Sequence, residues 1–160
     1  MYALISKIPL VTKTLAIVLL ILSIIPSYAA SQNNVNKEGI GLSGYDPVSY
    51  FMSAPMKGYP ALKYTYKGAT YQFENEENRQ TFIQKPEKYS PAYGGWCAWA
   101  MLDGEKVKID PLSYKIINGK NYVFYNGFWG NTLDKWNEKA LAETETSLVK
   151  TANAEWATQK

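Results

Sequence analysis

Two sulfur-bearing side chains, Cys97 and Met101, have the spacing that a soft-metal site needs. Met101 follows Cys97 by four positions, an offset that places both side chains on the same side of a helix or a strand. In a helix their Cβ atoms would be about 5–6 Å apart, close enough to share one ion. In a strand they would be roughly 13 Å apart, which is too far. Because thiolate and thioether ligands suit Cu(I), a helical segment here is predicted to bind Cu(I).

The thiol of Cys97 has two other interpretations, which the sequence leaves open. Its neighbours Trp96, Ala98 and Trp99 are apolar, and a free cysteine in such surroundings commonly serves as a small core residue. Met101 is equally suited to fill a core. A redox or mixed-disulfide role is the third interpretation. It needs a lysine, a helix N-terminus or a metal to activate the thiol, because the chain has no histidine.

The composition excludes more chemistry than any motif suggests. The chain has 160 residues, no histidine and one cysteine. Without histidine there is no Ser-His or Cys-His nucleophile pair, no histidine-ligated haem and no zinc site with histidine ligands. One cysteine excludes an intrachain disulfide and a multi-cysteine metal cage within one chain. We therefore expect a binding protein rather than an enzyme.

Residues 1–29 have the organisation of a cleavable export signal. Lys7 and Lys13 form a basic start, and Leu15–Ile25 is an apolar run broken by one serine. Small residues then occupy the cleavage positions before Ala30. The run is shorter than the about 20 residues of a membrane-spanning helix, which favours cleavage over an uncleaved anchor. We expect a periplasmic or secreted protein with no membrane attachment after cleavage.

The mature chain is expected to be nearly neutral. Two of the 17 basic residues lie in the export signal, so 15 basic side chains face 14 acidic ones, a net charge of +1. This balance offers no electrostatic argument for a nucleic acid or a membrane surface as partner. The expected partners are a soft metal ion or a periplasmic protein.

Two hairpins are predicted after a polar, flexible lead-in over residues 30–39. Residues 63–66 and 70–73 alternate aromatic and β-branched side chains on either side of a glycine-containing turn. Residues 114–117 and 122–125 form a second pair, and an Asn-Gly dipeptide indicates the turn between them.

Helices complete an α+β fold. Asn75 is the expected N-cap of the first helix, and Pro86 ends it. A second helical stretch runs from about Thr132 to near the end of the chain. The prediction is a single small domain over 40–141, with two β-hairpins packed against helices, and a C-terminal helical extension over 142–160. The core face of the last helix is expected to carry Leu133, Trp136, Ala140 and Leu141.

Other polar and glycine positions have structural interpretations. Asp46 is expected to accept backbone hydrogen bonds in a turn, although a functional role beside Tyr93 or Cys97 stays open. Gly94 and Gly95 indicate a backbone with positive φ or close packing.

Four ordered motifs carry a resemblance to the YHS-domain family. They are Gly44–Phe51 (GYDPVSYF), Tyr66–Phe73 (YKGATYQF), Asn75–Phe82 (NEENRQTF) followed by Pro86–Tyr89 (PEKY), and Tyr93–Ala100 (YGGWCAWA). The chain resembles the exported bacterial form of this family, strongly over residues 40–105 and more weakly to Trp136. The resemblance implies a small α+β domain.

Metal-associated relatives in this family are thought to bind a soft metal through cysteines. This chain has Ser49 and Glu74 where two of those cysteines stand, and Cys97 is the thiol that remains. The expected function is an exported YHS-domain protein that binds copper or another soft metal through Cys97 and Met101. The alternatives are a thiol-dependent redox protein or enzyme, and a protein-interaction module with Cys97 in its core.

Overall fold

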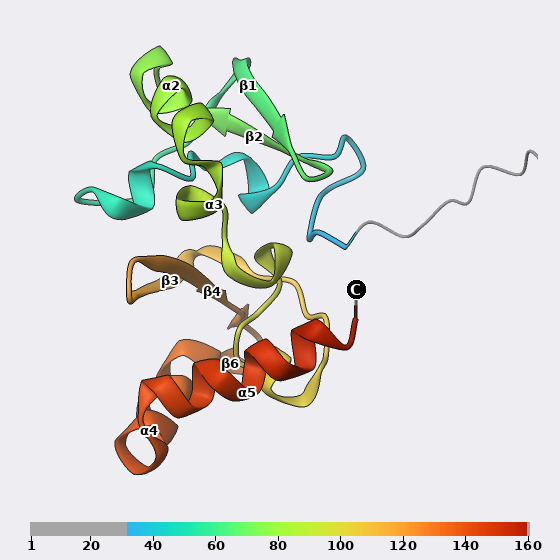
Figure 1. Cartoon of the computed structure of the whole chain (residues 1–160), viewed down its shortest axis with the longest axis vertical. Helices are drawn as coiled ribbons and strands as arrows, with labels where there is room; N and C mark the ends of the chain where they lie inside the picture. The colour runs from blue at the N-terminus through green and yellow to red at the C-terminus, as the bar shows by residue number, and fades with distance from the viewer. Residues whose placement is uncertain (1–31, 160) are drawn as a thin grey trace, which may run out of the picture. The chain divides into compact units, whose positions relative to one another are not determined.

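The structure, a computed structural model, describes residues 32–159, so the predicted export signal over 1–29 and its cleavage position lie outside the described residues. Within 32–159, no helix is long and apolar enough to cross a membrane. The predicted α+β fold, a small domain of hairpins packed with helices, is confirmed (Figure 1). The elements are η1 (Leu42–Gly44), η2 (Ser49–Phe51), β1 (Tyr59–Tyr66), β2 (Ala69–Phe73), α2 (Glu76–Gln84), α3 (Pro86–Tyr89), η3 (Ala92–Gly95), η4 (Ala100–Asp103), β3 (Asp110–Ile117), β4 (Lys120–Phe124), β5 (Asn126–Gly127), β6 (Gly130–Asn131), α4 (Thr132–Glu143) and α5 (Glu145–Ala157).

The first hairpin pairs β1 with β2 around a turn at Lys67 and Gly68. These two residues have φ values of 47° and 82°, a conformation whose twist matches that of the flanking strands. Alternate residues of β2 are buried, as the sequence pattern predicts. Strand β1 begins four residues earlier than expected, because an irregularity between Tyr59 and Lys63 lets Tyr59 pair with Phe73.

The second hairpin, β3 with β4, repeats this plan. Its strands also have eight and five residues, and its turn residues Asn118 and Gly119 also have positive φ. Each hairpin is followed by a helix whose N-cap is an asparagine, Asn75 for α2 and Asn131 for α4. Figure 1 shows β1 and β2 with α2 and α3 in one half, and β3 and β4 with α4 and α5 in the other.

Two hydrophobic clusters form the core, and β4 contributes to both. Val123 packs in the first cluster with Phe73 and Phe82, whereas Phe124 packs in the second with Trp136. Successive side chains of a strand point to opposite faces, so one strand serves both clusters. Phe82 and Trp136 are fully buried, and the core position predicted for Trp136 is confirmed.

The C-terminal segment is two helices rather than the single one predicted. Thr144 breaks it with φ 69° and ψ 146°, and the hydroxyl of Thr144 accepts a hydrogen bond from the N–H of Ser147 at the start of α5. Leu148 and Ala152 of α5 are buried in the second cluster, so α5 packs against the domain. The expected core position of Leu141 is also wrong. This residue is 91% exposed, because it lies about 100° around the helix from its neighbour Ala140.

The polar segment expected to be a flexible lead-in is instead held against the domain. We call residues 32–34 the strap. The backbone N–H of Asn34 donates to the carbonyl of Gly94 at 2.9 Å, and the amide of Asn33 donates to the carbonyl of Lys67 at 2.7 Å. The indole N–H of Trp96 donates to the carbonyl of Gln32 at 2.9 Å. These partners are distant in sequence, so the polar composition of the strap gave no indication of them.

Candidate functional site

Cys97 and Met101 lie at the two ends of a single helical turn. The N–H of Met101 donates to the carbonyl of Cys97 at 3.1 Å. Met101 lies within η4, and Cys97 precedes this element. The backbone N–H of Cys97 donates to Val107, and that of Ala98 donates to Val123 of β4. The helical spacing assumed for the soft-metal prediction is therefore present in the backbone.

The two sulfur atoms nevertheless have separate neighbours. Cys97 Sγ accepts from the N–H of Tyr125 at 3.3 Å and lies 3.4 Å from Thr132 Oγ1. Met101 Sδ accepts from the side-chain amide of Gln159 at 3.6 Å. Among residues 32–159, no group of three or more histidine, cysteine, aspartate or glutamate side chains is placed to hold a metal ion.

The hydrogen bonds of Cys97 connect its side chain to Tyr125 and Thr132. The hydroxyl of Thr132 donates to the carbonyl of Tyr125 at 2.9 Å, so its oxygen is free to accept the S–H of Cys97. The side chain of Cys97 is fully buried beneath a pocket of about 230 Å³ that Trp99 and Trp129 also line, and we call this the Cys97 pocket. Met101 does not line it. This burial favours the core interpretation of Cys97 over the redox one.

Asp46 is a structural carboxylate. It is fully buried and accepts from the N–H of Val48 at 2.8 Å, the N–H of Glu74 at 3.0 Å and the amide of Asn78 at 2.7 Å. These bonds tie the Asp-Pro turn to the end of β2 and the start of α2. The prediction that Asp46 accepts backbone hydrogen bonds is confirmed, and the hydrogen-bond partners of its carboxylate within residues 32–159 include neither Tyr93 nor Cys97.

A larger pocket, of about 490 Å³, is formed by segments from the whole described chain, and we call it the Tyr93 pocket. Its wall includes the strap, the β1–β2 turn, α3, η3, the start of β4 and α5. The residues that line it are Gln32, Asn33, Tyr66, Lys67, Tyr71, Glu87, Ser90, Pro91, Ala92, Tyr93, Gly94, Lys120, Tyr122, Asn153 and Trp156.

Aromatic side chains form one wall of the Tyr93 pocket. The ring of Tyr93 lies 5.7 Å from that of Tyr122 and 6.2 Å from that of Trp156, measured between centroids, and both pairs are edge-to-face. Burial raises the pKa of the Tyr71, Tyr93 and Tyr122 phenols, so these hydroxyls remain protonated at neutral pH. The hydroxyl of Tyr93 donates to Asn153 Oδ1 at 3.1 Å.

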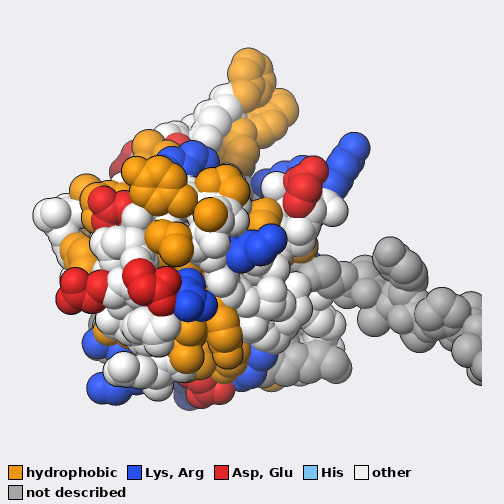
Figure 2. All heavy atoms as spheres, turned by 90° about the horizontal axis from the view of Figure 1, so that it is seen from above, with side chains coloured by type: hydrophobic (Ala, Val, Ile, Leu, Met, Phe, Trp, Pro, Cys, Tyr) orange, Lys and Arg blue, Asp and Glu red, His pale blue; other side chains and the backbone are white. Residues whose placement is uncertain are grey.

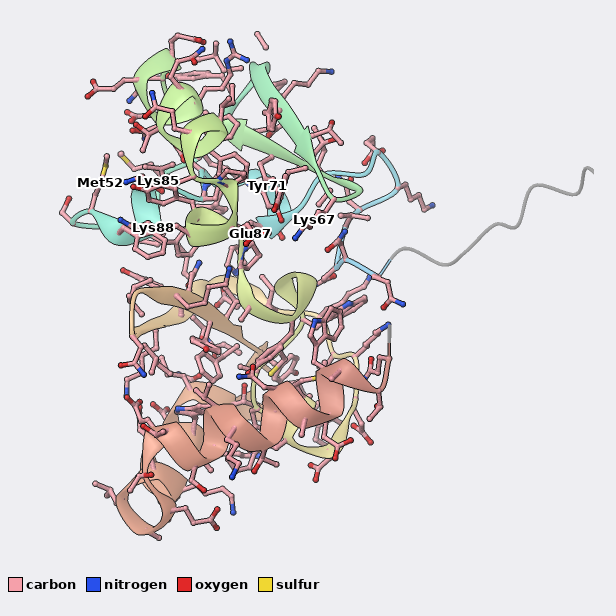
Figure 3. The ribbon with its side chains drawn as sticks, in the orientation of Figure 1. Met52, Lys67, Tyr71, Lys85, Glu87 and Lys88 are labelled. Carbon is pink, nitrogen blue, oxygen red and sulfur yellow. The ribbon has the colours of Figure 1, made fainter. Side chains whose placement is uncertain are left out.

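The charged groups of this pocket are unevenly paired. Lys67 and Glu87 form an ion pair at 2.8 Å, and Figure 3 shows both near Tyr71. Lys120 Nζ donates instead to the backbone carbonyl of Glu87 at 2.5 Å and lies 3.5 Å from Ser90 Oγ. Burial lowers the pKa of Lys120, and Lys67 adds to this effect while the Glu87 carboxylate opposes it. Lys120 forms no ion pair with any residue of the described chain.

The backbone beside this pocket is strained. Tyr93 has φ 53° and ψ 34°, a left-handed conformation that costs a non-glycine residue roughly 1–2 kcal/mol. Gly94 and Gly95 follow with φ of 60° and 84°, which confirms the positive φ predicted for them. A Cβ on Gly94 would lie 2.8 Å from Asn33 Oδ1 and 3.0 Å from the carbonyl of Gln32, so the strap needs this glycine.

The sequence signals did not identify the Tyr93 pocket. The Gly94-Gly95 pair was the one indication, because it predicts positive φ or close packing beside Tyr93. Lys120 belonged only to a predicted turn, and Asn153 and Trp156 only to a helical tail. Charges of both signs are present on the face that Figure 2 shows.

Comparisons of the chain with models of known protein families, with curated proteins and with solved structures found no match. The resemblance to the YHS-domain family therefore stays a prediction that rests on the four sequence motifs.

Proposed function

We propose that this protein is an exported binding protein that holds a small organic molecule in the Tyr93 pocket. A volume of about 490 Å³ falls in the range of small-molecule sites, about 300–1,000 Å³. Such sites combine apolar walls with a few polar groups that orient the ligand. Here the rings of Tyr93, Tyr122 and Trp156 supply the wall, and Lys120 and Asn153 supply polar groups.

The observation that carries this proposal is the strained backbone of Tyr93 at the pocket. A non-glycine residue keeps a left-handed conformation only where its surroundings enforce it, and such residues cluster at binding sites. The strap, the hydrogen bond from Tyr93 to Asn153 and the ring of Trp156 all hold Tyr93 in this position. The Tyr93 side chain is thereby fixed before any ligand arrives, which reduces the entropy lost on binding.

Binding is a better-supported proposal than catalysis or soft-metal transport. The one thiol of the chain faces Tyr125 and Thr132 rather than the Tyr93 pocket. The sulfur atoms of Cys97 and Met101 have different hydrogen-bonding neighbours, which gives the copper hypothesis less support than the pocket has. Copper binding by Cys97 and Met101 stays a prediction with its own test.

A pocket-filling variant tests the proposal. Asn153 lines the Tyr93 pocket from an exposed position of α5, so Asn153→Trp places an indole in the pocket. It also removes the acceptor of the Tyr93 hydroxyl, which Ser90→Phe leaves in place. Ala154→Trp is the matched control, because Ala154 is also exposed on α5 and does not line the pocket. The probes are 2-naphthoate and its neutral amide, 2-naphthamide, titrated by calorimetry into the mature protein.

We expect at least one probe to bind the parent and Ala154→Trp with Kd below about 1 mM, and to bind Asn153→Trp at least about tenfold more weakly. Thermal melting checks that both variants are folded. Ser90→Phe fills the pocket from another wall and should give the same loss. The proposal is wrong if neither probe binds the parent, or if the filling variants bind as the control does.

A further inference from the structure

The charges of the Tyr93 pocket indicate the chemical class of its ligand. Glu87 is the acidic residue of the wall, and its carboxylate is already engaged by Lys67 at 2.8 Å and by the hydroxyl of Tyr66 at 3.1 Å. The other cation, Lys120, forms no ion pair with residues 32–159. One positive charge at the pocket is therefore unbalanced.

Lys120 is held so that it can bind an anion. As the first residue of β4 it is partly buried, and its ammonium is anchored on the carbonyl of Glu87, with the hydroxyl of Ser90 at 3.5 Å. An ammonium has three N–H donors, so one N–H group remains after hydrogen bonds to these two neighbours. Both neighbours are uncharged groups, which orient the ammonium without neutralising it.

Other polar groups of the pocket wall can also donate hydrogen bonds. The Oδ1 atom of Asn153 accepts from Tyr93, which leaves the amide N–H groups of Asn153 to donate. The phenols of Tyr71 and Tyr122 stay protonated because burial raises their pKa values. A pocket that offers donors and one unpaired cation complements a singly charged acceptor.

We propose that the ligand of the Tyr93 pocket is an aromatic or heteroaromatic carboxylate, with its ring against Tyr93, Tyr122 and Trp156 and its charge on Lys120. This inference rests on the proposed function of the pocket. A carboxylate carries the single negative charge that one free ammonium balances, and an aromatic body matches the edge-to-face rings of the wall.

The test compares an acid with its neutral isostere. Calorimetry measures the affinities of 2-naphthoate and 2-naphthamide for the mature parent, for Lys120→Met and for Lys63→Met. Lys63 is the matched control, because it is an exposed lysine of β1 outside the Tyr93 pocket. Lys120→Arg keeps the charge and is the second variant.

We expect the parent to bind 2-naphthoate about tenfold or more tightly than 2-naphthamide, as one charge-assisted hydrogen bond provides. Lys120→Met should abolish this preference, and Lys63→Met and Lys120→Arg should keep it. Equal affinities for acid and amide in the parent, or a preference that survives Lys120→Met, would overturn the inference. Binding of both probes without preference leaves the proposed function intact, whereas binding of neither contradicts the function itself.

Discussion

Substitution of Gly94 by alanine should loosen the strap from the domain. Gly94 has φ 60°, and an added Cβ would lie 2.8 Å from Asn33 Oδ1 and 3.0 Å from the carbonyl of Gln32. The side chain of Asn33 must move away from this Cβ, and the backbone of Gln32 and Asn33 must shift by a few tenths of an ångström. Gly119→Ala is a close control, because Gly119 has φ 75° and no atom within 4 Å of its added Cβ.

The difference between these two variants isolates the clash with the strap. Both lose roughly 1 kcal/mol of stability because alanine disfavours positive φ. Gly94→Ala should also weaken hydrogen bonds to the strap, from Asn34 to Gly94 and Gly95 and from Trp96 to Gln32. At about 0.5–1.5 kcal/mol each, partial loss of these bonds adds about 1–3 kcal/mol to the free energy lost.

Urea denaturation measures this difference. With a slope of about 1–3 kcal/mol per molar urea, an extra loss of about 2 kcal/mol lowers the midpoint of Gly94→Ala by about 1 M relative to Gly119→Ala. Hydrogen exchange at the amide of Asn34 should accelerate in Gly94→Ala and not in Gly119→Ala, because that amide is bonded to Gly94. Equal midpoints together with unchanged exchange at Asn34 would refute the role assigned to the strap.

Four further predictions follow from the core, the pocket, the thiol and the export signal. Phe82→Ala and Trp136→Ala should each lower the free energy of unfolding by about 3–5 kcal/mol, because both rings are fully buried. In the same urea series Phe128→Ala is the control and should change the free energy of unfolding by less than about 0.5 kcal/mol, because Phe128 is 89% exposed. The affinity for 2-naphthoate should be lost as the pH rises through the pKa of Lys120, while the affinity for 2-naphthamide stays constant in calorimetry over the same range. Burial and Lys67 lower this pKa and Glu87 opposes them, so the loss is expected below the ordinary lysine value of about 10.4. If Cys97 and Met101 hold Cu(I), anaerobic competition with a chromophoric chelator should show binding that Cys97→Ser abolishes and Met101→Leu weakens, and equal affinity in the parent and Cys97→Ser would remove the copper hypothesis. Intact mass of the exported protein should place its N-terminus at Ala30 or within a few residues of it, and a full-length mass in the membrane fraction would contradict cleavage.

Local features of the fold were predictable because neighbouring residues determine them. Alternating side chains and glycine-containing turns predict both hairpins, and Asn75 caps α2 through a hydrogen bond to the N–H of Asn78, three residues away. The break at Thr144 was missed, because threonine is not a residue that commonly adopts positive φ. Ala140 and Leu141 were both assigned to the core face, although only Ala140 packs against the second cluster.

The Tyr93 pocket could not be predicted, because its wall extends from Gln32 to Trp156. Lys120 can be identified as the cation without an ion pair among the described residues only when the structure shows that Lys67 pairs with the nearby carboxylate of Glu87. For the predicted soft-metal site, the spacing of Cys97 and Met101 left helix and strand open, and the structure places the two residues on one helical turn. Hydrogen bonds from Tyr125 and Gln159, which are distant in sequence, determine where each sulfur atom lies.

Nuclear magnetic resonance of the ¹⁵N-labelled mature protein during titration with 2-naphthoate identifies the pocket that holds the ligand. Binding in the Tyr93 pocket should shift the backbone amides of Gly94 and Lys120 and the indole N–H of Trp156, because these groups belong to residues that line this pocket. The amide of Thr132 and the indole N–H of Trp129, at the Cys97 pocket, should stay unchanged. Shifts confined to Thr132 and Trp129, or no shifts in either pocket, would contradict binding in the Tyr93 pocket.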